Sequence, residues 1–275
     1  MSQRPVPVPD SCEWLYAVMT PEPLDHEDHV PLPSAALLRA HGTSQVGLAR
    51  LERCSHQLVM QSQAPTSAAA AAARDTRIRA LELAARHDGV VLELLTPRVV
   101  ELTSDQVSLA HATQWYVLDH AAVLDDVLLT DGLAQFGLPE VRLRPAPGGG
   151  AGPRAADGSG GGAGPRAADG PGGGAGPRAA DGPGEGDRVL LDPAVRGMVS
   201  AVLAGLVHRL IEEWPEHDPV GEATVTLRDI AFGLGDPQAD VTPSDRGVRV
   251  RIDYVPDDHV LAVELLDDPA TGLFA

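Results

Sequence analysis

The densest group of side chains that could do chemistry is the run Asp25-His26-Glu27-Asp28-His29, which holds two imidazoles and three carboxylates. Imidazole and carboxylate groups are common metal ligands, and the spacing of His26 and His29 could place both rings on one face of a turn. Prolines flank the run on both sides, and no further His or Glu pair follows at a metalloenzyme spacing. We therefore favour a solvated acidic loop. A metal site formed by Asp25, His26, Asp28 and His29 is the alternative.

Cys54 and His56 form a second candidate pair, because a thiolate beside an imidazole can act as a nucleophile. In the strand predicted here, side chains two positions apart are separated by about 7 Å, which is too far for a direct hydrogen bond. No electropositive surroundings are visible that would activate the thiol, so we expect a buried structural cysteine. Cys12 and Cys54 are the only cysteines and cannot build a disulfide framework, so both are expected to be thiols.

Asp119-His120, followed by Asp125-Asp126, could supply a base and its orienting carboxylate, but these residues equally suit the surface at a strand end. The chain has no nucleophile elbow, no phosphate-binding loop with lysine, and no dinucleotide fingerprint between a strand and a helix. The three tryptophans, Trp14, Trp115 and Trp214, are interpreted as core residues, with an exposed partner anchor as the alternative. We predict no catalytic residue and no cofactor.

The chain of 275 residues carries a formal charge of -18, contains no lysine, and has no basic segment. Such a protein gains little from counterion release and is repelled by anionic lipid, so we expect neither nucleic-acid nor membrane binding. The Pro-rich start, residues 1–10, lacks the apolar segment of a secretory signal. No stretch reaches the roughly 18 apolar residues of a membrane span. We expect a cytoplasmic protein.

A tandem repeat divides the chain. Residues 149–160, 161–172 and 173–184 each read GGAGPRAADGxG. This composition has no aromatic or β-branched residue and cannot bury enough apolar surface to offset the entropy of ordering. We predict that residues 146–187 are a flexible, disordered insert rich in Gly, Pro and Ala. A slippage-expanded surface loop is the preferred interpretation, and a selected spacer or docking segment is the alternative.

The elements that must position these residues follow from hydrophobic periodicity and from capping signals. Before the repeat we predict helices at 34–41 and 67–87, and strands at 13–20, 51–63, 90–95, 99–103, 112–118 and 140–143. After it, Asp192-Pro193 opens a helix over 192–213 whose apolar stripe includes Val199 and Leu206. Strands at 223–230, 247–255 and 260–266 complete the chain.

Together these elements predict an α+β fold, a mainly antiparallel sheet packed by two long helices. The segment after the repeat offers too thin a core to fold alone, because small domains bury a smaller fraction of their surface. We therefore prefer a single domain made of residues 10–145 and 188–270, with the 192–213 helix on the first-half sheet and tails at 1–9 and 271–275. Two tethered domains are the alternative.

One stretch resembles a known family. Trp115-Tyr116-Val117-Leu118, followed by TDGLAQFGLPE over residues 130–140, resembles an uncharacterised bacterial, actinobacterial-type domain family with a Trp-Tyr strand and a T-x-G-L-x-x-F-G-L-P-E segment. Residues 84–91 resemble its helix-to-strand step. The resemblance implies that the strand and the following helix are normally adjacent, so the repeat interrupts their loop. It also implies special backbone geometry at Gly132 and Gly137 and a core position for Phe136.

For function, the dispersed acids and the absence of nucleophile-base pairs favour a non-catalytic module that binds another protein through its sheet or a loop. One alternative is a metal-assisted hydrolase that uses the Asp25–His29 cluster. A second alternative is a small-ligand sensor with a pocket between the helices and the sheet.

Overall fold

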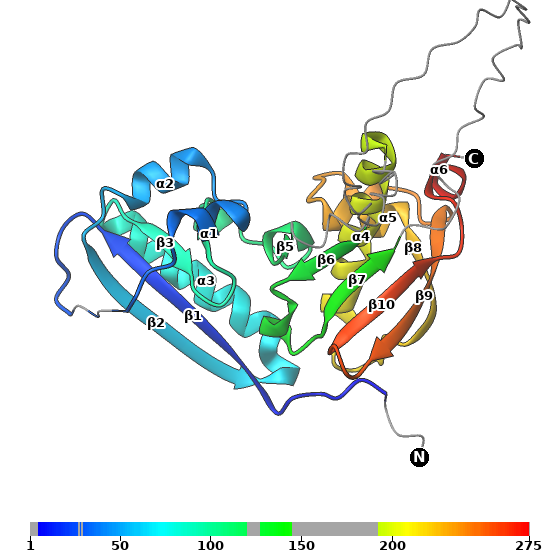
Figure 1. The fold of residues 1–275 in the computed structure, drawn as a ribbon, viewed down its shortest axis with the longest axis horizontal. Helices are drawn as coiled ribbons and strands as arrows, with labels where there is room; N and C mark the ends of the chain where they lie inside the picture. The colour runs from blue at the N-terminus through cyan, green and yellow to red at the C-terminus, as the bar shows by residue number, and fades with distance from the viewer. Residues whose placement is uncertain (1–4, 27, 29, 120–126, 145–191, 275) are drawn as a thin grey trace, which may run out of the picture.

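The computed structural model describes residues 5–26, 28, 30–119, 127–144 and 192–274. The chain first builds a four-stranded antiparallel sheet in the order β2-β1-β3-β4 (Figure 1). Its strands are β1 (Ser11–Thr20), β2 (His56–Pro65), β3 (Val90–Glu93) and β4 (Arg98–Val100). β1 and β2 pair along their whole length, whereas β3 pairs only with the second half of β1.

Helices cover both faces of this sheet because its central strand alternates two sets of apolar side chains. Trp14, Tyr16 and Val18 point to the side of α3 (Ala69–Arg86) and join the main core. Ala17 and Met19 point to the other side, into a smaller core under α1 (Ala35–Ala40) and α2 (Gln45–Leu51). β1 is therefore buried on both faces along its second half.

The second sheet is six-stranded and mixed, in the order β5-β6-β7-β10-β9-β8. Its strands are β5 (Val117–Leu118), β6 (Leu128–Asp131), β7 (Glu140–Arg144), β8 (Gly221–Thr226), β9 (Gly247–Val255) and β10 (Val260–Leu265). β7 and β10 are parallel, and the other neighbours are antiparallel. Since β7 precedes residues 145–191 and β10 follows them, the chain on both sides of the repeat contributes to one sheet.

α4 (Pro193–Glu213) lies across the second sheet and packs closely on α5 (Leu227–Gly233) (Figure 1). The two helices meet at glycines. A β-carbon on Gly205 would lie 2.8 Å from the backbone nitrogen of Ile230, and one on Gly233 would lie 2.3 Å from the carbonyl oxygen of Ala204. The contact is therefore backbone against backbone, and it depends on the missing side chains.

The two sheets share one apolar core. A single cluster of buried residues runs from Trp14 on β1, through Trp115, to Val250 on β9. Both ends of the described chain also contribute, because Val6 is fully buried and Leu273 of α6 (Pro269–Phe274) is 4% exposed. Val6 and Leu273, which were expected to lie in the tails at 1–9 and 271–275, are therefore part of the core.

The α+β class is confirmed, but the expected single, mainly antiparallel sheet is instead two sheets, of which the second is mixed. The predicted packing of two long helices on that one sheet is not shown. α3 contacts the strands of the first sheet, whereas α4 contacts α5, α6 and β8. The predicted flexible repeat at 146–187 lies outside the described residues.

Three predicted strands differ for local reasons. The strand predicted at 51–63 begins later than expected. The side chain of Ser44 accepts a hydrogen bond from the backbone nitrogen of Gly47 and starts α2, which extends to Leu51, so β2 starts only at His56. The 112–118 strand is mostly a turn of 3-10 helix, since only Val117 and Leu118 pair with β6. The 223–230 strand ends at Thr226, whose capping box with Asp229 starts α5.

Candidate functional site: a cleft beside the free edge of β1

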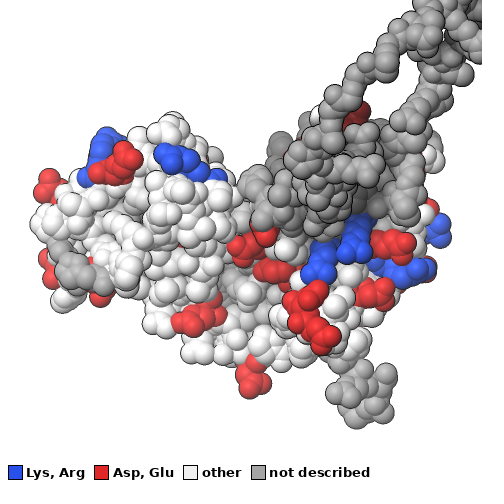
Figure 2. All heavy atoms as spheres, viewed as in Figure 1, with Lys and Arg blue, Asp and Glu red and all other residues white. Residues whose placement is uncertain are grey.

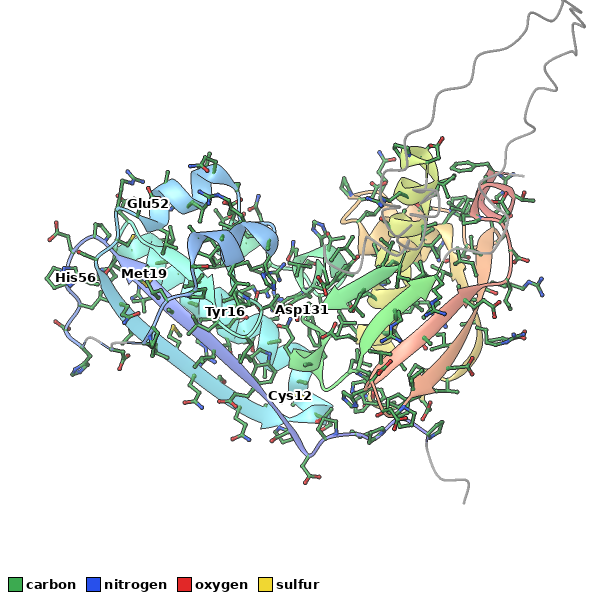
Figure 3. The ribbon with its side chains drawn as sticks, viewed as in Figure 1. Cys12, Tyr16, Met19, Glu52, His56 and Asp131 are labelled. Atoms are coloured by element: carbon green, nitrogen blue, oxygen red, sulfur yellow. The ribbon has the colours of Figure 1, made fainter. Side chains whose placement is uncertain are left out.

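A cavity of about 330 Å³ lies where β1 continues past the end of β3. Tyr16 is the first residue of β1 that pairs with β3, so the preceding residues have an open side. The cavity is lined there by residues 11–16 of β1. Leu95 and Thr96, together with several residues of the segment 131–138, form the opposite wall. The cavity thus sits between the two sheets, where Figure 3 labels Tyr16 and Asp131.

The backbone of β1 offers unpaired hydrogen-bonding groups to this cavity. In an antiparallel pair, alternate residues point their N–H and C=O groups away from the partner strand. Val59, which faces Ala17, donates outward from β2 to Asp28, and the carbonyl of Leu15 accepts from Leu94 on the β3 side. The odd-numbered residues of β1 therefore point toward the cleft. Pairing with β3 begins only at Tyr16, so the groups of Ser11 and Glu13 that point this way have no strand partner among the described residues, and no loop backbone bonds to them there.

The wall opposite β1 is a tight loop held by the carboxylate of one half-buried residue, Glu140. Gly132 and Gly137, with φ of 128° and 72°, bracket a 3-10 helix at Leu133–Phe136. Glu140 accepts hydrogen bonds from the backbone nitrogens of Gly132, Leu133 and Ala134, at 2.8 to 3.3 Å. Burial raises the pKa of Glu140, and these hydrogen bonds act in the opposite direction. The loop is thereby held in place against the cleft.

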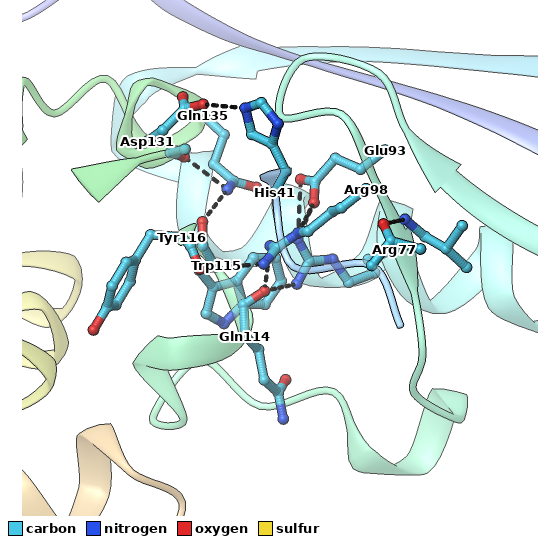
Figure 4. A network of polar contacts seen from close by, with 12 residues as sticks. His41, Arg77, Glu93, Arg98, Gln114, Trp115, Tyr116, Asp131 and Gln135 are labelled. Atoms are coloured by element: carbon cyan, nitrogen blue, oxygen red, sulfur yellow. Dashed lines mark hydrogen bonds and ion pairs between the residues drawn. The ribbon is translucent and has the colours of Figure 1, made fainter. Parts of the chain in front are cut away.

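Gln135 on this loop presents a buried acceptor with no donor. Its Nε2 donates to the carbonyls of Trp115 and Gly132, each at 2.8 Å (Figure 4). Two carbonyl acceptors require the NH₂ end of the amide at that position, so the orientation of the side chain is determined. Oε1 is buried and has no hydrogen-bond partner among the described residues, although Gln135 is only 6% exposed and lines the cavity. An unmet buried acceptor of this kind costs about 1–3 kcal/mol.

A buried ionic network lies behind the cavity. Glu93, which lines it, pairs with Arg77 at 3.1 Å and with Arg98 at 2.8 Å. Arg77 is fully buried and lies 3.7 Å over the ring of Trp115. Both arginines also donate to the carbonyl of Gln114, at 2.7 and 2.6 Å. The network therefore ties the 112–118 segment, which leads into the second sheet, to the first sheet.

The charge state of this network follows from opposing effects. Burial by itself would raise the pKa of Glu93, but Arg77 and Arg98 outweigh it and hold the pKa below its ordinary value of 4.5. Glu93 is therefore a fixed anion at neutral pH. A carboxylate with a lowered pKa and both oxygens engaged makes a poor general base, so its role here is structural.

Asp131 closes the cleft on the side of α1. Its Oδ2 lies 3.2 Å from Nε2 of His41. The other ring nitrogen of His41, Nδ1, lies 2.9 Å from the carbonyl oxygen of Leu37, so Nδ1 carries the hydrogen. Burial raises the pKa of Asp131, and the neighbouring His41 lowers it. This contact links the first helix of the chain to the second sheet.

The cleft holds no arrangement suited to nucleophilic catalysis among its lining residues. The Cys12 thiol lies 3.6 Å from the hydroxyl of Thr66, and burial raises the pKa of that thiol, which keeps it protonated. Burial likewise raises the pKa of Tyr16 to about 12. These groups can offer hydrogen bonds and apolar surface, and they suit binding better than bond breaking.

The Asp25–His29 cluster does not converge in the part of the chain that the structure describes. The carboxylate of Asp28 accepts from the backbone nitrogen of Val59 at 2.8 Å, and its own backbone nitrogen donates to the carbonyl of Gln57. Asp25 and His26 are exposed. Glu27 and His29 lie outside the described residues. No group of three potential metal ligands occurs within the described ranges.

The structure brings none of the other candidate residues from the sequence together into a site within the part of the chain that it describes. Cys54 lies before β2 rather than in it, so its predicted place in a strand with His56 is wrong. Its thiol donates to the carbonyl of Arg50 at 3.4 Å, and the residue is half-buried rather than buried as expected. His120 and the Asp125-Asp126 pair lie outside the described residues. Trp14, Trp115 and Trp214 are at most 7% exposed, which confirms their interpretation as core residues.

Sequence reasoning missed the cleft, yet it had singled out the segment that forms one wall. The resemblance at residues 130–140 implied special geometry at Gly132 and Gly137 and a buried Phe136. All three are confirmed by the positive φ angles and by the 2% exposure of the phenylalanine. The roles of Asp131, Gln135 and Glu140 depend on contacts with distant elements, and no local spacing signals them.

Comparisons of the chain with family models, with curated proteins and with solved structures find no match. One helix, α4, is long and apolar enough to cross a membrane by length and composition, contrary to the expectation that no such segment exists. More than half of that stretch, 56%, is buried inside the protein, and a buried core helix passes the same test.

Proposed function

We propose that the chain is a non-catalytic cytoplasmic module that binds an extended segment of a partner protein along the free edge of β1. The observation that carries this proposal is the open edge at Ser11 and Glu13, which faces a preformed cavity. An extended peptide placed there would add a strand in the position that β3 leaves vacant. Neither nucleic acid nor membrane is the proposed partner.

The energetics favour a backbone partner. A strand laid beside Glu13 could exchange two hydrogen bonds with it, each with a net value of about 0.5–1.5 kcal/mol. The cavity walls add apolar contact from Leu15, Leu95 and Leu138. Leu95 is 54% exposed in the free protein, so it has apolar surface left to bury. Because the Glu140-capped loop is already in position, little ordering of the protein would be required.

A small-ligand sensor is a second candidate, because a larger cavity of about 490 Å³ lies on the other side of Arg98. It is bounded by β4, His41, His111 and residues 113–114 and 116–118. Its size falls in the range of small-molecule sites, roughly 300–1,000 Å³. A thermal-shift screen of small molecules tests it. Stabilisation that Glu13→Pro leaves unchanged would place the ligand in this cavity and outside the cleft beside β1.

The peptide proposal is tested with two proline substitutions on strands that face each other. Glu13 and Gln63 are direct neighbours in the β1–β2 register, and their N–H groups point to opposite edges of the pair. Glu13→Pro removes the donor that faces the cleft, and Gln63→Pro removes the equivalent donor on the outer edge of β2. Neither donor has a backbone partner among the described residues, so both variants should fold.

The probe is a phage-displayed hexapeptide library panned against the full chain, with enriched peptides synthesised and measured by fluorescence anisotropy. We expect Glu13→Pro to weaken binding about tenfold, since about 1.4 kcal/mol is lost, and Gln63→Pro to change it less than twofold. Failure to enrich any peptide, or equal binding to both variants, would contradict the proposal.

A further inference from the structure

The charges on the cavity wall differ in sign from those behind it. Among the described residues, three carboxylates line the cavity, namely Glu13, Glu93 and Asp131, and no arginine does. In Figure 2 acidic atoms are visible at the centre of the face, where Figure 3 labels Asp131. His259 is the one titratable base in the described part of the lining, and its Nδ1 is engaged with the hydroxyl of Tyr254 at 2.8 Å.

The arginines that neutralise Glu93 are turned away from the cavity. Arg77 is stacked on Trp115 and donates to Tyr16, Gln114 and Glu93. Arg98 lines the second cavity instead and donates to the carbonyls of Tyr116 and Gln114. A ligand in the cleft would therefore contact the carboxylates, whereas the guanidinium groups of Arg77 and Arg98 lie behind Glu93.

The buried oxygen of Gln135, which has no donor among the described residues, independently indicates which kind of group would bind in the cavity. Figure 4 shows its amide nitrogen turned toward the carbonyl of Trp115, and the same nitrogen also donates to the carbonyl of Gly132. Its Oε1 has no donor among the described residues, although the residue is only 6% exposed. A carbonyl oxygen in a cavity that carboxylates also line can be satisfied only by a hydrogen-bond donor, which excludes an anion.

We infer that the partner segment places a basic side chain, Arg or Lys, into this cavity, with its N–H groups shared between Gln135 Oε1 and the carboxylates of Asp131 and Glu13. This inference rests on the proposed function. A guanidinium offers five donors and an ammonium three, and neither accepts, which matches a wall of acceptors. The excess of acid in the whole chain adds long-range attraction for the same partner.

The test uses the peptides enriched in the library experiment. Each residue of a binding hexapeptide is replaced in turn, with Arg changed to citrulline and Lys to norleucine, and binding is measured to the full chain. We expect one basic position at which the neutral replacement weakens binding about tenfold or more, as for a hydrogen bond to a charged group. At that position the loss should shrink to about threefold or less in Asp131→Asn and in Glu13→Gln.

A control for charge is needed, and the outcomes must distinguish the basic specificity from the strand-edge site. Glu82→Gln removes one exposed negative charge on α3, away from the cavity, and should leave the tenfold preference unchanged. Peptides that lose affinity on Glu13→Pro but tolerate neutral residues at every position would overturn the basic specificity and leave the strand-edge site standing. A peptide preference for Asp or Glu would overturn it as well. If no peptide binds, both the strand-edge site and its basic specificity are contradicted.

Discussion

At the scale of single residues, the carboxylate of Glu93 is held on both oxygens within a buried ionic network. It is 4% exposed and touches two guanidinium groups, one of which is fully buried. Removing one member of a buried ion pair leaves the other charge uncompensated, which costs about 3–5 kcal/mol. By contrast, an exposed pair such as Arg251 with Glu264 contributes about 0–1 kcal/mol.

We predict that Glu93→Gln lowers the free energy of unfolding by about 3–5 kcal/mol at pH 7, and that Glu264→Gln lowers it by less than about 1 kcal/mol. The folded-state pKa of Glu93 is below 4.5, so its contribution is complete above that value and is lost as pH falls through the lowered pKa. The difference between the native chain and Glu93→Gln should therefore shrink below about pH 4.5. Urea denaturation at a series of pH values measures it, and a difference that stays constant down to pH 3 would contradict the assignment.

At the scale of elements, α4 contains two glycines with opposite surroundings. A β-carbon on Gly205 would lie 2.8 Å from the backbone nitrogen of Ile230, whereas one on Gly197 meets nothing within 4 Å. Alanine is the better helix former by about 0.5–1 kcal/mol, so free space decides the sign of each substitution.

Gly197→Ala should raise the free energy of unfolding by about 0.5–1 kcal/mol. Gly205→Ala should lower it by about 1–3 kcal/mol, because α5 must move to admit the methyl group. Chemical denaturation of the two variants gives the comparison directly. If both substitutions stabilise the protein, the close contact between α4 and α5 is wrong.

Element prediction from the sequence succeeded where the periodicity was long and the caps were strong. The helices at 67–87 and 192–213 and the strands at 247–255 and 260–266 were predicted within a few residues of α3, α4, β9 and β10. The failures are at 45–55, 112–118 and 227–230, where a capping residue or a buried turn overrides a short apolar run. In each case tertiary packing or one side-chain hydrogen bond decides the backbone.

The pairing of the strands could not be predicted from the sequence. Nothing local distinguishes one sheet from two, because β7 pairs with β10 across more than a hundred positions and β3 simply ends before β1 does. For the same reason the cleft could not be predicted. Its acceptors, Gln135 and Asp131, become significant only beside an edge left open by a strand that is far away in sequence.

At the scale of the whole molecule, the core joins segments from both sides of residues 145–191. Leu143 of β7 lies beside Val263 of β10, and both belong to the cluster that contains Trp14 and Trp115. This arrangement supports the proposal that residues 10–145 and 188–270 form one folding unit with an inserted repeat.

Deleting residues 149–184 should leave a protein that unfolds in one cooperative transition, with circular dichroism and tryptophan fluorescence changing together. Shortening the connection about fourfold should raise the free energy of unfolding by about 1 kcal/mol through a smaller loop-closure entropy. Two separate transitions, before and after the deletion, would favour two tethered units instead.

The central claim is that a partner segment pairs with the backbone of β1 at Glu13, and hydrogen exchange at that amide tests it most directly. Amide exchange can be followed by NMR in the free chain and with a saturating amount of an enriched hexapeptide. We predict that the Glu13 amide exchanges rapidly in the free chain and becomes protected in the complex, while the Gln63 amide, on the opposite edge, does not change. An unchanged exchange rate at Glu13 in the saturated complex would show that the peptide binds elsewhere.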